Sequence, residues 1–82
     1  MLTEYIDKAL KRAHYEMIDD EEPFYGEIKV LKGIWASGKT LEDCRQNLKE
    51  VLEGWILVSV KKGLHIPKID NVSIEEIKEA AA

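Results

Sequence analysis

The sequence has few of the residues and segments that mark specialised classes of protein. Its single cysteine, Cys44, cannot form an internal disulfide. No apolar run approaches the roughly 18 residues that a membrane-spanning helix needs, and the N-terminus lacks the charged, apolar and small-residue pattern of a secretory signal. These absences lead us to expect a cytoplasmic protein with a reduced thiol and no membrane partner.

The chain also lacks the basic excess that is typical of nucleic-acid-binding proteins. It carries 16 acidic and 12 basic residues, which give a net charge of −4 at pH 7. This balance disfavours a nucleic-acid backbone as the main partner and suits a basic protein partner. Charged residues make up 34% and hydrophobic residues 45% of the sequence, so we expect an ordinary folded domain.

With 82 residues, the sequence is short, and we interpret residues 1–82 as one domain. A core of this size supplies only about 3–5 kcal/mol of stability, so a homo-oligomer, a dimer or tetramer, is expected. The domain divides into an N-terminal helix over residues 1–13, a core over 14–67 and a tail over 68–82.

A long amphipathic helix between Gly38 and Gly63 is the element on which the rest is arranged. Thr40 suits the N-cap because its hydroxyl can accept a hydrogen bond from a free amide of the first turn, and Gly63 suits the left-handed stop. The spacing predicts a buried apolar stripe made of Leu41, Cys44, Leu48, Val51, Leu52 and Trp55.

The last turns of this helix, Trp55 to Val60, are apolar nearly all round. Such a segment is normally covered on more than one side. Either the N-terminal helix of the same chain or a second subunit could cover it, and the sequence leaves both alternatives open. Three residues beside or opposite the stripe, Ile56, Leu57 and Val60, are therefore candidate interface residues.

Periodicity predicts the elements that precede the long helix. A short amphipathic helix is expected from Leu2 to Ala13, followed by strands from His14 to Ile18, from Phe24 to Val30, and over Ile34 to Ser37. The first two strands flank an acidic turn that contains Pro23, which is typical of a hairpin.

After the long helix, Leu64 to Ile66 predicts a brief edge strand that ends at Pro67, and Ser73 to Glu76 fits a capping box for a final short helix. The expected order is α-β-β-β-α-β-α. This is an α+β fold in which a three- to four-stranded antiparallel sheet carries the long helix on one face. Candidate contact residues on the other face are Tyr25, Glu27, Lys29 and Trp35.

Two motifs with a chemical meaning are better explained by structure. Residues 33–40 match the phosphate-loop pattern, but the bulky Ile34 and Trp35 suit a strand, and too little chain follows for the parallel sheet of a nucleotide-binding domain. The acidic run over residues 19–22 lacks the alternating ligands and central glycine of a calcium loop.

The two histidines, His14 and His65, do not have metal-ligand spacing to each other or to Cys44. We expect no cofactor, metal or catalytic residue. An enzymatic alternative is a minimal metal-dependent nuclease that uses Glu16, Asp19 and Glu27, although proximity on an acidic hairpin explains these carboxylates more simply.

Several short motifs follow one another in a fixed order and spacing. They are Tyr25-Gly26-Glu27-Ile28, residues 33–44, Asn47-Leu48, Leu52 to Trp55, and Gly63-Leu64-His65-Ile66-Pro67. In this order and spacing, over roughly residues 14–67, the chain resembles the HicB-like antitoxin family. The resemblance implies a partial ribonuclease-H-like fold without the catalytic carboxylates. It also implies a non-enzymatic protein that neutralises a small basic messenger-RNA-cleaving toxin of the HicA type. An acidic chain suits such a partner.

The chain departs from the family pattern at both ends. The residues after Pro67 are too few and too acidic for the helix-turn-helix or ribbon-helix-helix segment with which many members bind operator DNA, so no direct DNA binding is expected. The helix from Leu2 to Ala13 resembles that of small stand-alone members, for which a toxin partner is not assured. A stand-alone homo-oligomer without a toxin therefore remains an alternative to an antitoxin.

Overall fold

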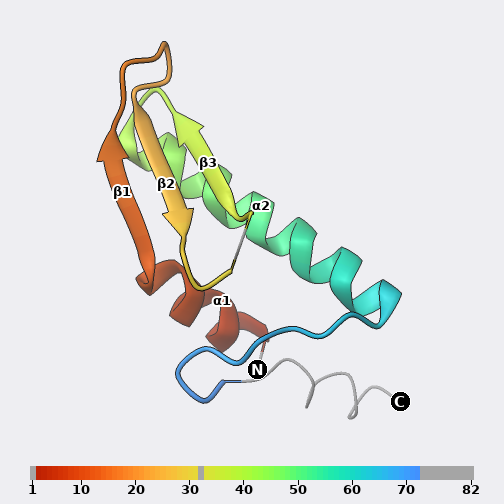
Figure 1. Ribbon diagram of the computed structural model, residues 1–82. Coiled ribbons are helices and arrows are strands. Elements are labelled where there is room, and N and C mark those ends of the chain that lie inside the picture. Colours follow the sequence, from red (N-terminus) through yellow and green to blue (C-terminus); the bar gives the residue numbers. More distant parts are fainter. Residues whose placement is uncertain (1, 32, 73–82) are drawn as a thin grey trace.

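Figure 1 shows a computed structural model, which describes residues 2–31 and 33–72. Its elements are α1 (Leu2–Lys11), β1 (Ala13–Met17), β2 (Phe24–Ile28), β3 (Trp35–Gly38) and α2 (Leu41–Lys62). The strands form an antiparallel three-stranded sheet in the order β1-β2-β3, and α2 lies across one face (Figure 1). The predicted α+β class and the order of elements through α2 are confirmed. The predicted C-terminal helix lies outside the described residues.

Helix α2 begins and ends where its capping residues predict. The Asp43 backbone N–H donates to the Thr40 hydroxyl at 3.0 Å. At the other end, Gly63 adopts the left-handed conformation with φ 68°, and the N–H of Leu64 donates to the Ser59 carbonyl at 2.9 Å. Both ends therefore satisfy backbone groups that a helix leaves without intrahelical partners.

The buried stripe of α2 differs from the predicted one at its first residue and in its C-terminal half. The stripe consists of Cys44, Leu48, Leu52, Ile56 and Ser59. Leu41 and Val51 belong to the predicted stripe but are 43% and 40% exposed. The stripe turns toward Ile56 because α1 and the segment after α2 contribute to the core on that side. Periodicity along one helix cannot show where its neighbours lie.

The sheet face under α2 includes small residues that allow close packing. Gly26 lies opposite Tyr15 on β1 and opposite Ala36 on β3. A Cβ at Gly38 would lie 2.4 Å from the Cys44 backbone nitrogen, so only glycine fits where β3 meets the first turn of α2. Side chains alternate along each strand, so the intervening residues form the opposite, open face of the sheet.

Helix α1 is held against α2 by the segment that follows Gly63. Ile66 and Ile69 are buried in the core, and the Tyr5 hydroxyl donates to the Pro67 carbonyl at 2.7 Å. Arg12 forms an ion pair with Asp70. In Figure 1 this segment, drawn in blue, runs back beneath α1.

The predicted edge strand over Leu64 to Ile66 does not form. The described residues of this segment make only an isolated bridge between Ile69 and Val72. Ile66 packs in the core with α1, whereas Leu64 is 55% exposed, and the segment does not reach an edge of the sheet. Among the described residues, the structure contains no helix long and apolar enough to cross a membrane.

Candidate protein-binding surface

The open face of the sheet gathers polar and aromatic side chains from all three strands. Antiparallel pairing places His14 opposite Glu27, Glu16 opposite Tyr25, and Trp35 opposite Glu27 on its other side. Tyr25 and Trp35 are diagonal neighbours, and their rings stack with centroids 5.9 Å apart and an interplanar angle of 25°. Trp35 is still 54% exposed, so the stacked pair offers a large aromatic surface.

Carboxylates surround this aromatic pair. The Tyr25 hydroxyl donates to Glu27 Oε2 at 3.4 Å. Loss of solvent around the hydroxyl raises the pKa of Tyr25, and the negative charge of Glu27, its hydrogen bond and the charge of Glu16 raise it further. The open face therefore combines an exposed tryptophan, stacked on a half-buried tyrosine, with negative charge.

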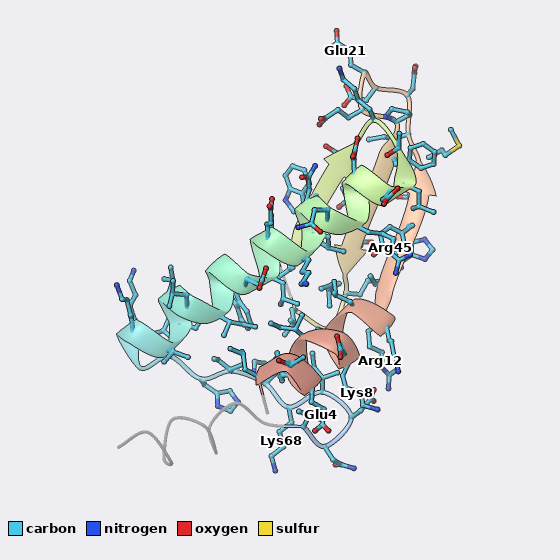
Figure 2. The ribbon with its side chains drawn as sticks, turned by 180° about the vertical axis from the view of Figure 1, so that it is seen from behind. Glu4, Lys8, Arg12, Glu21, Arg45 and Lys68 are labelled. Atoms are coloured by element: carbon cyan, nitrogen blue, oxygen red, sulfur yellow. The ribbon has the colours of Figure 1, made fainter. Side chains whose placement is uncertain are left out.

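The acidic loop between β1 and β2 is tied to the same region. The Ser37 hydroxyl on β3 donates to Glu22 Oε1 at 2.7 Å, and the Asn47 side-chain amide on α2 donates to the Ser37 carbonyl at 2.9 Å. Figure 2 shows Glu21 at the tip of this loop, far from Lys8 on α1 and from Arg12 just after it. Negative charge thus continues from the open face to one end of the molecule.

The structure brings the predicted sheet-face residues together. Tyr25, Glu27 and Trp35 share the open face, while Lys29 lies just past the end of β2. Glu27, Lys29 and Trp35 line a shallow hollow of about 370 Å³ beside the β2–β3 connection. The second strand was predicted to continue to Val30, but it ends at Ile28 and leaves Val30 54% exposed in the turn.

Sequence reasoning did not assign His14 and Ser37 to this face and placed Glu16 only in the nuclease alternative. All three lie opposite Tyr25 or Glu27 in the strand register. The alternation within β1 separates His14 and Glu16 from Tyr15, but only the pairing with β2 places them beside the aromatic pair. That pairing could have been inferred from the hairpin had the length of its loop been known.

The predicted helix-flank residues separate in the structure. Ile56 is 4% exposed and belongs to the core, so we correct its assignment to an interface. Val60 is half-buried and packs against the core. Leu57 is 61% exposed. The N-terminal helix α1 and the segment after α2 thus cover one side of these turns. The side with Leu57 is left open, so the alternative that a second subunit covers it stays a prediction.

The described residues do not group the carboxylates that the nuclease alternative requires. Within residues 2–31 and 33–72, no three His, Cys, Asp or Glu side chains are placed to hold a metal ion, and this includes Glu16, Asp19 and Glu27. The phosphate-loop match is also part of the fold: Trp35–Gly38 form β3, and the Thr40 hydroxyl caps α2.

The thiol of Cys44 and a broad hollow beside α2 are less suited to binding or chemistry. Cys44 is fully buried, and its burial, followed by the charge of Glu22, raises the pKa of the thiol. A thiol in this state is a poor nucleophile. A broad hollow of about 750 Å³ lies between Leu10 and the first turns of α2, and its lining mixes acidic residues with Arg45 and Lys49.

Comparison with known proteins assigns the family. The UPF0150-like family matches residues 4–67, which include most of α1, the whole sheet and α2. The chain belongs to the UPF0150-like family. The crystal structure of TTHA0281 from Thermus thermophilus is similar to this UPF0150-like chain, with a TM-score of 0.86 and 48% sequence identity over 89% of this chain and 90% of that chain. No curated protein matches the sequence.

Proposed function

We propose that this UPF0150-like protein is a non-enzymatic binding module of the HicB-like antitoxin type. Its open sheet face would cover a small basic protein, for which a messenger-RNA-cleaving toxin of the HicA type is the proposed partner. The observation that carries the proposal is the exposed Tyr25–Trp35 stack with Glu27 and Glu16 beside it.

The aromatic pair supplies the centre of such an interface. Exposed aromatic residues are enriched among the few side chains that dominate binding energy. Stacking and the Tyr25–Glu27 hydrogen bond hold the two rings before any partner arrives, so little side-chain freedom is lost on binding. The pair is thus arranged to pack against an apolar patch on another protein.

The carboxylates supply selection among partners. Glu16 and Glu27 flank the aromatic pair, and the acidic loop over residues 19–22 continues from the end of β1. Opposite charge accelerates encounter with a basic protein and disfavours acidic ones. The net charge of −4 acts in the same direction.

The first test is to purify the tagged chain from its native cell and to assay the ribonuclease activity of what accompanies it. We expect a small basic ribonuclease whose RNA cleavage stops when excess wild-type chain is added. Recovery of the chain alone would favour a stand-alone homo-oligomer and contradict the proposal. Magnesium-dependent cleavage of RNA by the chain itself, abolished in Glu27→Gln, would support the nuclease alternative and also contradict it.

Matched variants then locate the surface. Trp35→Ala is expected to raise the Kd for the recovered ribonuclease roughly 30-fold or more, as is common for a central aromatic residue. Met17→Ala is the control, because Met17 is 70% exposed at the end of β1 and lies outside the aromatic pair. Equal Kd values for the two variants would place the binding surface elsewhere. Isothermal titration calorimetry gives both values.

A further inference from the structure

The second half of α2 exposes an apolar surface that α1 and the sheet leave uncovered. Figure 1 shows α2 crossing behind the strands and continuing past the edge of β3. Val51, Leu57 and Val58 in this half are 40%, 61% and 49% exposed. We call this surface the outer face of α2, and it consists of Glu50, Val51, Gly54, Leu57, Val58 and Lys61.

Gly54 lies at the centre of the outer face. Helical spacing places Val51, Leu57 and Val58 three or four residues from it, so their side chains surround the position. Apart from its own helix, no described atom lies within 4 Å of a Cβ built at Gly54. The packing of the described residues therefore does not require a glycine here, although glycine weakens a helix interior. Its missing side chain leaves a notch between Leu57 and Val51.

The geometry points to a dimer in which α2 of one copy packs antiparallel on α2 of a second copy, with Leu57 of each seated at Gly54 of the other. The midpoint between Gly54 and Leu57 along the helix lies between Trp55 and Ile56. A two-fold axis at that point places each exposed leucine against the notch of the partner copy. An apolar knob then fills a hole that nothing else among the described residues fills.

The charges on the outer face fit the same axis. Glu50 and Lys61 are both exposed, and their midpoint is also between Trp55 and Ile56. At 1.5 Å per residue they are roughly 16 Å apart along the axis of their own helix, too far for a direct ion pair within it. Across the two-fold axis, each Glu50 meets Lys61 of the other copy. One axis therefore satisfies both the apolar contact and the charge pairing.

The shared axis favours a second copy of this chain as the partner, and an antiparallel rather than a parallel arrangement of the two α2 helices. A parallel pair of helices would place Glu50 beside Glu50 and Lys61 beside Lys61, which is repulsive. A uniformly basic partner would meet Lys61 and the adjacent Lys62 with like charge. A second copy in the antiparallel direction complements both ends of the face. Because α2 covers only one face of the sheet, the open face with Tyr25 and Trp35 stays accessible in the dimer.

The first experiment measures self-association of the full chain by sedimentation equilibrium over a range of concentrations. We expect a dimer whose dissociation constant rises roughly 100-fold or more in Leu57→Glu, since the substitution places two buried charges in one symmetric interface. Met17→Glu is the matched control, because Met17 is 70% exposed on β1 and should leave the dimer intact. A monomeric wild type at millimolar concentration would overturn the inference.

A second variant separates association from folding. Gly54→Ala should raise the urea midpoint of the isolated chain, because alanine favours a helix interior, and should raise the dissociation constant about tenfold or more, because its methyl group occupies the notch. A merely structural glycine would not give a variant that folds more stably but associates more weakly. A tighter dimer in Gly54→Ala would contradict the proposed contact.

Disulfide trapping tests the direction. A mixture of Gly54→Cys and Leu57→Cys chains, oxidised gently, should form the mixed disulfide in preference to either homodisulfide, since position 54 of one copy lies directly against position 57 of the other, whereas like positions are displaced along the helix axis. Cys44 is buried and does not compete. Preferential Leu57→Cys homodisulfides would indicate a parallel dimer, and a wild-type dimer broken by Trp35→Ala but not by Leu57→Glu would place the interface on the sheet. Either result overturns the inference without affecting the test of the proposed toxin partner.

Discussion

At Gly38 the backbone of β3 lies directly against the first turn of α2. A Cβ there would be 2.4 Å from the Cys44 nitrogen and 2.9 Å from the Asp43 carbonyl carbon, and backbone atoms cannot rotate away as a side chain can. Gly38→Ala is therefore expected to lower the free energy of unfolding by at least about 2 kcal/mol. Urea denaturation measures it, with the exposed neighbour Lys39→Ala as control. A loss equal to that of the control would contradict the close approach.

Tyr5 gives the molecule a pH dependence at the level of one hydroxyl. Its ring is fully buried, and burial raises its pKa from 10.0 to about 12. Between these values the hydroxyl ionises in the unfolded chain but stays protonated in the folded one. The contribution of Tyr5 to the free energy of unfolding is therefore complete below about pH 10. It falls as the pH rises toward 12, by about 2–3 kcal/mol in all.

Urea unfolding at several pH values between 9 and 12 checks this prediction. Tyr5→Phe is the control, since it keeps the ring and removes the ionisable group. Tyr15 and Tyr25 also have raised pKa values and remain in both chains, so the difference between wild type and variant isolates Tyr5. Parallel pH profiles for the two chains would show that Tyr5 does not cause the loss.

At the scale of elements, the turn after Ile69 closes the segment that holds α1 in place. Ile69 and Val72 exchange backbone hydrogen bonds of 3.1 and 2.9 Å across the turn, and Asn71 has a φ of 67°. A β-branched residue adopts this left-handed conformation reluctantly. Asn71→Val should therefore destabilise the protein by about 1–2 kcal/mol, whereas Asn71→Gly should cost little.

Hydrogen exchange of the α1 amides shows whether the turn acts on the helix. We expect protection in α1 to fall in Asn71→Val, because the Tyr5–Pro67 and Arg12–Asp70 contacts depend on the path of this segment. Protection in the N-terminal half of α2 should change less. Uniform loss across both helices would show that α1 and the turn do not open as a separate unit.

The elements themselves were predictable wherever a local signal defines them. Thr40 and Gly63 marked the ends of α2 because caps act within one turn, alternation marked the first two strands, and a β-prone composition marked the third. The signal failed where the covering element is distant in sequence. Leu64 to Ile66 has the composition of a strand, but Ile66 packs in the core with α1. These residues lie near opposite ends of the described sequence, so no local pattern shows that they meet.

The same limit explains what could be foreseen of the binding surface. Tyr25, Glu27 and Trp35 alternate away from the buried side of their strands, so their exposure follows from the sequence. The stacking of Tyr25 on Trp35 depends on register, and the burial of Ile56 depends on α1, so neither could be inferred from one segment alone. Gly54 gave no signal because an exposed glycine matters only when another helix approaches it.

At the scale of the whole molecule, the open sheet face and the outer face of α2 lie on different sides of the fold. A dimer through α2 would present two open sheet faces, each with its own Tyr25–Trp35 pair. Two linked faces bind a dimeric or repeated partner more tightly than one face does, provided that the geometry lets both engage. The proposed self-association would therefore strengthen the proposed binding without sharing a residue with it.

Self-association would also make the thermal stability of the whole molecule depend on its concentration. Because only folded chains dimerise, a hundredfold increase in protein concentration stabilises each folded chain by up to about 1.4 kcal/mol. For a domain of this size the Tm should then rise by up to about 5–10 °C. Calorimetry at about 5 µM and about 500 µM measures the shift. This is roughly the range over which a dimer of a small domain dissociates.

The Tm of Leu57→Glu should be independent of concentration, whereas Met17→Glu should keep the shift of the wild type. A constant Tm in the wild type would show that the folded chain does not associate in this range.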